Sequence, residues 1–230
     1  MKKLIHIICV TIIVSTVLDA CKKPKPEPEE EQTGNGKNIT ITLPADQTIL
    51  ILDLGDSLKA MQGVVIKNDK GKQITEGIVI EGLDEVGRKG LTYIVKESDG
   101  KVVQKSRQAI VKADKLCGSY KATVISRPTW DPVSYDVLKN DTNIVAVTIA
   151  NIWMGGVSYD FAVFTPDEST PYALKFIDGF KTTQGSMYGK ARFDYGKTGD
   201  IFAFKTGFLE GYRKDNDLLV IIDTVLLEKQ

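Results

Sequence analysis

Short runs of apolar and β-branched residues, separated by turn residues, recur along the chain from Ile39 to Leu227. Ile201–Phe204 and Tyr188–Tyr195 show most clearly the alternation of a strand with one buried face. No window of about eleven residues keeps a helical apolar period. The content of 42% hydrophobic and 26% charged residues is typical of globular proteins and excludes wholesale disorder. The sequence therefore predicts an all-β protein.

The aromatic residues divide the chain into two regions. The sequence holds 8 Phe, 8 Tyr and 2 Trp, and all but Tyr93 lie between Tyr120 and Tyr212. One uniform domain would rarely segregate its aromatic residues so sharply. We therefore predict a boundary near Asp114, with one β domain over residues 39–113 and a second over residues 114–230.

The first region is rich in short strand signals. Strands are expected at Ile39–Leu43, Ile49–Leu54, Gly63–Ile66, Gly77–Ile80, Leu91–Val95 and Val102–Val111. Asn68–Gly71 and Ser98–Gly100 supply the Asp, Asn and Gly residues that tight turns favour. Six short strands in this length fit an immunoglobulin-like (Ig-like) β-sandwich.

The order of four segments in this region carries a family resemblance. Asp69–Thr75, Val79–Gly82, Gly90–Val95 and Arg107–Val111 follow one another in a way that resembles the bacterial Ig-like domains of adhesins and Cry-type pesticidal proteins. The resemblance implies a spacer or presentation module rather than a catalyst. It also implies that Tyr93 is a core residue and that Arg107 pairs with a carboxylate at a strand edge.

The second region predicts another antiparallel β domain. Strands are expected at Leu116–Val124, Ile144–Ala150, Tyr159–Phe164, Tyr172–Phe176, Met187–Tyr195, Ile201–Phe208 and Leu218–Leu227. This pattern fits either a β-sandwich or a small calycin-like barrel. Its opening, Leu116-Cys-Gly-Ser-Tyr120, resembles the C-terminal domains of small Bacteroidetes lipoproteins that also carry an Ig-like module. That resemblance implies the architecture of the domain and a surface location, and it says nothing about an activity.

The N-terminus has the pattern of a targeting segment. Lys2 and Lys3 precede the apolar run Leu4–Leu18, which is too short for the ~20 residues of a membrane-spanning helix. The following Leu18-Asp-Ala-Cys21 resembles the lipobox of bacterial lipoproteins. The resemblance implies that residues 1–20 are removed and that Cys21 carries fatty acyl chains such as palmitate, which anchor it to a membrane. The alternative is an ordinary signal peptide with a nearby cysteine.

Residues 22–38 have the composition of a tether. Proline alternates with charge, two glycines follow, and no apolar residue is present to pack. The acidic cluster Glu27–Glu31 resembles the export signal of Bacteroidetes surface lipoproteins. We therefore expect an outer-membrane, cell-surface location, with the periplasmic face as the alternative.

Charge and histidine content exclude several kinds of function. Equal numbers of basic and acidic residues, 30 of each, argue against a nucleic-acid binder. The single histidine, His6, lies in the segment expected to be removed, which excludes histidine-based catalysis and His-ligated zinc. Cys117 then has no histidine to activate it and is expected to be a buried small apolar residue. We expect neither a cofactor nor an enzyme.

Two tryptophans are the candidate ligand-binding residues. Trp130 lies between Pro128 and Pro132, which favour a loop over a strand interior. Trp153 precedes the turn at Gly155 and Gly156. Each ring could present a flat apolar face to a sugar, and for each the alternative is core or loop packing.

Acidic residues offer two weaker candidate sites. Asp215-Asn216-Asp217 supplies oxygen ligands for a hard cation, but turn formation explains the same residues, and no metal is expected. Asp167 and Glu168 could pair with Asp178 as glycosidase carboxylates, or lie solvated in loops.

Three functions follow from these patterns. The first is a lipid-anchored surface binding protein, with a saccharide or a surface protein as partner, serving as a glycan-binding accessory of nutrient uptake. The alternatives are a structural spacer for protein assembly and a carboxylate-dependent hydrolase.

Overall fold

The computed structural model describes residues 36–45, 49–154, 157–176, 187–213, 215–216 and 219–230. From Gly34 to Gln230 the chain forms one compact unit. Within the described ranges, helices are short, and none could cross a membrane.

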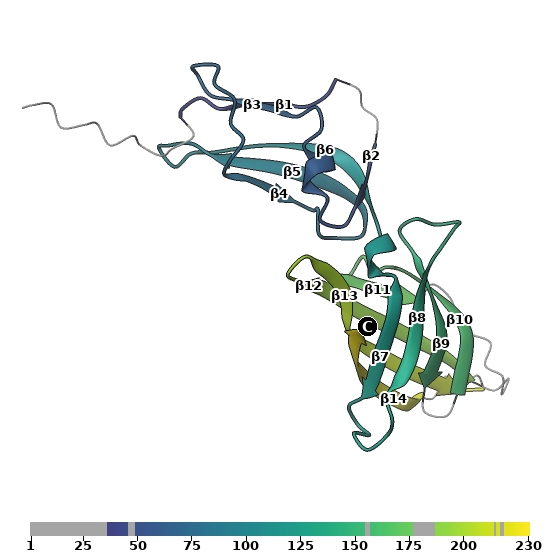
Figure 1. The fold of residues 1–230 in the computed structure, drawn as a ribbon. Coiled ribbons are helices and arrows are strands. Elements are labelled where there is room, and N and C mark those ends of the chain that lie inside the picture. Colours follow the sequence, from purple (N-terminus) through teal and green to yellow (C-terminus); the bar gives the residue numbers. More distant parts are fainter. Residues whose placement is uncertain (1–35, 46–48, 155–156, 177–186, 214, 217–218) are drawn as a thin grey trace, which may run out of the picture. The chain divides into compact units, whose positions relative to one another are not determined.

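Residues 40–112 form two small sheets (Figure 1). In the first, β1 (Thr40–Thr42) pairs antiparallel with β3 (Val65–Lys67). The second has the order β2 (Leu50–Asp53), β6 (Val102–Lys112), β5 (Gly87–Lys96) and β4 (Ile78–Glu81). β2 runs parallel to β6, and the other pairs are antiparallel. A short helix, α1 (Ser57–Ala60), follows β2 and was not predicted.

An apolar core joins the two sheets. It holds residues of β1, β3, α1 and the larger sheet, including Ile41, Ile66, Ala60, Leu91 and Tyr93. The Tyr93 hydroxyl donates to the Ala60 carbonyl at 2.6 Å, so Tyr93 is a core residue as expected. The strand positions and the all-β class agree with the sequence analysis, while the finer Ig-like assignment stays a prediction.

The expectation for Arg107 is wrong. Its Nη2 donates to the Ala60 carbonyl at 2.6 Å, and its guanidinium lies 5.7 Å from the centre of the Tyr93 ring. No carboxylate among the described residues forms an ion pair with it. The guanidinium therefore ties β6 to the end of α1 through a backbone carbonyl, a partner that sequence patterns cannot specify.

Residues 118–229 form a closed eight-stranded barrel (Figure 1). Its strands are β7 (Gly118–Val124), β8 (Val133–Lys139), β9 (Val147–Met154), β10 (Val157–Pro166), β11 (Ala173–Phe176), β12 (Met187–Thr198), β13 (Ile201–Arg213) and β14 (Leu219–Lys229). Each strand pairs antiparallel with its successor, and β14 pairs with β7 to close the barrel. Of the two predicted alternatives for this region, the barrel is therefore the one found.

The up-and-down order places successive connections at opposite ends of the barrel. The β7–β8 connection, residues 125–132, lies at one end, which we call the Trp130 end. The β8–β9, β10–β11 and β12–β13 connections lie at the other, which we call the Tyr172 end. The chain enters the barrel at the Tyr172 end through the short 3-10 helix η1 (Asp114–Leu116).

Aromatic side chains fill the barrel interior. Phe193 stacks on Phe164 with ring centres 4.9 Å apart and also contacts Tyr135 and Phe204. All four rings are fully buried. The aromatic segregation seen in the sequence thus reflects the packing of one barrel core.

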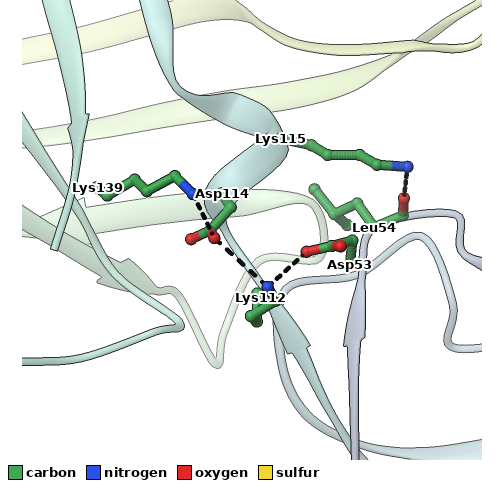
Figure 2. A network of polar contacts seen from close by, with 6 residues as sticks. All are labelled: Asp53, Leu54, Lys112, Asp114, Lys115 and Lys139. Carbon is green, nitrogen blue, oxygen red and sulfur yellow. Dashed lines mark hydrogen bonds and ion pairs between the residues drawn. The ribbon is translucent and has the colours of Figure 1, made fainter. Parts of the chain in front are cut away.

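A polar network surrounds η1 (Figure 2). Lys112 Nζ lies 2.8 Å from Asp53 Oδ1 and 3.5 Å from Asp114 Oδ2, and Lys139 Nζ lies 3.0 Å from the same Asp114 oxygen. Burial raises the pKa of Asp114, but the hydrogen bonds and charges of Lys139 and Lys112 outweigh it and leave the pKa below its usual value. Lys115 Nζ donates to the Leu54 carbonyl at 2.6 Å.

The apolar core of the barrel also includes residues that precede Asp114 in the sequence. Leu54, Val86, Val111 and Ala113 belong to the same buried cluster as the barrel aromatics. Partly exposed ion pairs contribute about 0–1 kcal/mol each, so these apolar contacts dominate the connection. The predicted boundary near Asp114, which concerns independent folding, stays a prediction.

Candidate functional site

A groove of about 320 Å³ lies at the rim of the barrel, at the Tyr172 end. One wall is the segment Glu85–Lys89, which leads into β5. The other wall is built from the β8–β9 and β10–β11 connections and from Tyr195. Its polar and aromatic lining includes Glu85, Lys89, Asn143, Thr165, Glu168, Thr170, Tyr172 and Tyr195. A volume of this size is at the lower end of the range for small-ligand sites.

Tyr172 has an unusual backbone conformation at this groove. Its φ is 58°, in the left-handed region that bulky side chains rarely adopt. Two backbone hydrogen bonds hold the segment: Tyr195 donates to the Tyr172 carbonyl at 2.8 Å, and Asp167 donates to the Ala173 carbonyl at 2.9 Å. Tyr172 is 48% exposed, and its ring centre lies 6.1 Å from that of Tyr195 in an edge-to-face arrangement. The fold therefore maintains strain at the position that exposes an aromatic ring.

Asp167 fixes the connection that carries Tyr172. Its Oδ1 accepts hydrogen bonds from the Ser169 hydroxyl at 2.7 Å, the Ser169 amide at 3.1 Å and Lys175 Nζ at 2.9 Å. Burial raises the pKa of Asp167, but these hydrogen bonds and the Lys175 charge outweigh it and bring the pKa to about 2. Asp167 is therefore a structural anchor and a poor general acid, which needs a raised pKa.

The opposite wall is held by one glycine and one hydrogen bond. Gly87 has φ 114°, and a Cβ there would lie 3.3 Å from Pro166, so glycine permits the wall to approach the barrel closely. The Val86 amide donates to the Tyr195 hydroxyl at 2.8 Å. Burial raises the pKa of Tyr195 to about 12, partly offset by this hydrogen bond. Glu85 and Lys89 form an ion pair at 2.7 Å beside the groove.

Trp130 lies at the far end of the barrel from this groove. Its side chain is 43% exposed, and the Arg127 guanidinium lies 4.1 Å from its ring centre. Its amide donates to the Arg127 carbonyl at 3.1 Å, which closes the turn. Part of the ring is therefore covered by a neighbouring cation.

Trp153 occurs near the end of β9, opposite Ser158 of β10. By strand order β9 ends at the Trp130 end, so the two predicted tryptophans belong to the same end of the barrel. The side chain of Trp153 lies outside what the structure describes, as do Cys21, Asp178 and Asp217 altogether.

The remaining predicted candidates have structural partners. Asp215 Oδ2 pairs with Arg213 Nη2 at 2.7 Å, and the described residues contain no cluster of three metal-ligating side chains. Cys117 packs against the barrel core, and burial raises the pKa of its thiol, which disfavours a nucleophilic thiolate.

Sequence reasoning missed Tyr172 as a site residue. It was expected at the start of a strand, and Pro171 before it gives a turn signal. Neither feature indicates a left-handed tyrosine, because that conformation depends on the hydrogen bonds with Tyr195 and Asp167.

Neither a family model nor a curated protein matches the sequence. Among solved structures, a lipoprotein from Bacteroides thetaiotaomicron aligns over 84% of this chain and 100% of its own, at 14% identity and a TM-score of 0.27. CBM51-2 and INT domains from Clostridium perfringens ZmpB, solved in complex with GlcNAc, align over 83% of this chain and 44% of theirs. Their identity is 11% and their TM-score 0.23. At these TM-scores neither likeness carries an argument about this chain.

Proposed function

We propose that the protein is a lipid-anchored surface binding protein whose rim groove at Tyr172 binds a saccharide. The observation that carries the proposal is the strained, half-exposed Tyr172 beside a groove lined by carboxylate, amide, hydroxyl and ammonium groups. Backbone strain that the surrounding structure holds in place clusters at functional positions.

The chemistry of the groove matches that of a sugar ring. A pyranose has an apolar C–H face, which an exposed aromatic ring covers, and equatorial hydroxyls that both donate and accept hydrogen bonds. Carboxylates of Glu85 and Glu168 accept, Lys89 donates, and Asn143 does both. Because the barrel behind the rim is filled by aromatic side chains, the ligand binds on the surface, as an end or a side of a chain.

The experiment is a glycan array probed with the full-length protein in mild detergent, followed by titration of the best ligand. Tyr172→Ala should weaken binding about tenfold or more, since aromatic anchors dominate such interfaces. Trp130→Ala is the matched control, because it removes an aromatic residue of similar exposure, 43% against 48%, from the other end of the barrel. If Trp130→Ala weakened binding and Tyr172→Ala did not, the binding site would lie at the Trp130 end instead. If the wild type bound no glycan, the spacer function would be favoured instead.

The lipid anchor is the second part of the proposal and rests on the lipobox-like pattern before Cys21. Cys21→Ser should abolish acylation and release the protein from membranes or leave it unprocessed. Mass spectrometry of the mature N-terminus measures this directly. A mature N-terminus elsewhere, without acyl mass on Cys21, would contradict the anchor and leave the groove untouched.

A further inference from the structure

A second groove, of about 280 Å³, lies on the outer face of the barrel, and we call it the outer groove. It is lined by charged and aromatic side chains of three neighbouring strands: Lys175 of β11, Lys190 and Arg192 of β12, and Phe208 and Glu210 of β13. In the register of the sheet, Arg192 is opposite Phe208. The residues that follow them, Phe193 and Leu209, are buried in the barrel core, so Arg192 and Phe208 face outward.

The outer groove meets the rim groove at Asp167, which lines both. The Asp167 side chain is only 8% exposed and pairs with Lys175 Nζ at 2.9 Å, whereas the Lys175 side chain is 45% exposed. At this junction a ligand therefore meets mainly the ammonium group. The two grooves form adjoining subsites on one surface of the barrel.

Two cations of the outer groove have hydrogen-bond donors to offer. Arg192 Nε donates to Asp194 Oδ1 at 3.0 Å, and the guanidinium lies 4.6 Å from the ring centre of Phe208. These contacts hold the guanidinium in place, while its Nη groups have no hydrogen-bond partner among the described residues. Lys190 Nζ lies 4.8 Å from the centre of the Tyr212 ring and forms no ion pair with a described carboxylate.

The balance of charge in the outer groove favours an anionic ligand group. Three basic residues line it against two acidic ones, Asp167 and Glu210. Asp167 is shielded from solvent, and Glu210 Oε2 accepts a hydrogen bond from the Tyr212 hydroxyl. The charge that faces a ligand is therefore mainly positive. Phe208, which is 39% exposed, adds an apolar surface beside the cations.

We propose that the outer groove binds the acidic group of an oligosaccharide whose neighbouring sugar occupies the rim groove. This inference rests on the proposed function and narrows the ligand from a saccharide to one that contains a uronic acid. The sugar carboxylate accepts hydrogen bonds from the Arg192 Nη groups and from the Lys190 ammonium group, and such charge-assisted bonds are stronger than those between neutral groups. The C–H face of the same sugar packs on the exposed part of Phe208, as its neighbour packs on Tyr172.

The test uses tetrasaccharides of galacturonate, glucuronate and mannuronate as probes, each as the free acid and as the methyl ester, with the full-length protein in mild detergent. In calorimetric titration at low salt, at least one free acid should bind about fivefold tighter than its ester, because the ester carries no charge for the two cations. The difference should shrink in about 0.5 M sodium chloride, which screens the charges.

Two variants and one control locate the acidic group. Lys190→Gln and Arg192→Gln should each bring the ratio of acid to ester affinity toward one. Lys190 is exposed, so Lys190→Gln serves as the test even if loss of the Arg192 ion pair lowers stability. Lys121→Gln is the matched control, because it removes an exposed lysine of β7 that lines neither groove and should keep the ratio.

Tyr172→Ala separates this inference from the proposed function. It should weaken the binding of acid and ester alike, because the rim groove holds a sugar that both contain. Equal affinity for acid and ester, or a ratio that Lys190→Gln and Arg192→Gln leave unchanged, would overturn the acidic subsite and leave the rim groove as the saccharide site. Binding of neutral glycans alone would do the same. If no glycan of either kind bound, the proposed function would fall as well.

Discussion

The hydroxyl oxygen of Tyr195 in β12 lies 2.8 Å from the amide nitrogen of Val86 and accepts its hydrogen bond, although 109 residues separate the two in sequence. Both residues are buried, Val86 at 2% and Tyr195 at 6% exposure. The bond attaches the segment before β5 to the barrel and thereby sets the width of the rim groove.

Tyr195→Phe tests this attachment. The ring remains, but the Val86 amide loses its acceptor in a place that water does not reach, so the free energy of unfolding should fall by about 1–3 kcal/mol. Urea unfolding followed by tryptophan fluorescence measures the change. Tyr172→Phe is the control, since it removes a hydroxyl from a half-exposed ring and should change stability by less than about 0.5 kcal/mol. Equal effects of the two variants would contradict the role of the Tyr195 hydroxyl.

The strain at Tyr172 predicts that the usual order of stability between an alanine and a glycine variant is reversed at this position. At an ordinary position glycine is less stable than alanine, because it has more freedom in the unfolded chain. At φ 58° the alanine Cβ is itself strained, so Tyr172→Gly should be more stable than Tyr172→Ala by about 1 kcal/mol. Both variants lose the ring contact with Tyr195, which therefore cancels in the comparison. Urea unfolding of the pair decides, and an alanine variant as stable as the glycine variant would show that the backbone is relaxed.

Much of the fold follows from the local sequence, because strands are read from alternation and turn residues. The six strand regions expected before Asp114 coincide with β1 to β6 within a few residues. β8 was missed, although Val133, Tyr135 and Val137 alternate inward, because Pro128 and Pro132 made the whole stretch resemble a loop. Whether the strands close into a barrel depends on pairing between β7 and β14, about 100 residues apart, and no local pattern reports that pairing.

The site was less predictable than the fold for a related reason. Exposed tryptophans can be picked out by residue type, and Trp130 is indeed exposed on a loop. Tyr172 differs from an ordinary turn residue through a long-range contact, because the Tyr195 amide holds its backbone carbonyl. The residues next to Tyr172 in the sequence do not indicate that contact.

Gly207 in β13 is expected to be irreplaceable for a packing reason. A Cβ at this position would lie 2.4 Å from Phe193 Cε1 and 2.7 Å from Val225 Cγ2, and both side chains are fully buried. Gly207→Ala should therefore destabilise the protein by about 1–3 kcal/mol through overpacking. Gly90→Ala in β5 is the matched control, because a Cβ there meets nothing within 4 Å. Thermal unfolding of the two variants compares them, and a neutral Gly207→Ala would mean that the barrel core adjusts freely.

The Asp167 anchor predicts a loss of stability in acid. Its pKa is about 2 in the folded protein, against an ordinary value of 3.8, because the hydrogen bonds from Ser169 and Lys175 outweigh the effect of burial. A carboxyl whose pKa is lowered by folding stabilises the fold above its unfolded pKa, and this contribution disappears as the pH falls toward the folded pKa. The difference in free energy of unfolding between the wild type and Asp167→Asn should thus be constant above about pH 5 and shrink between about pH 4 and pH 2. Lys175→Gln removes one donor and so brings the folded pKa of Asp167 closer to 3.8; in that background the decline should be smaller and end at a higher pH, while its start is unchanged. Urea unfolding across this pH range measures both curves, and a difference that did not change with pH would contradict the ionised anchor beneath Tyr172.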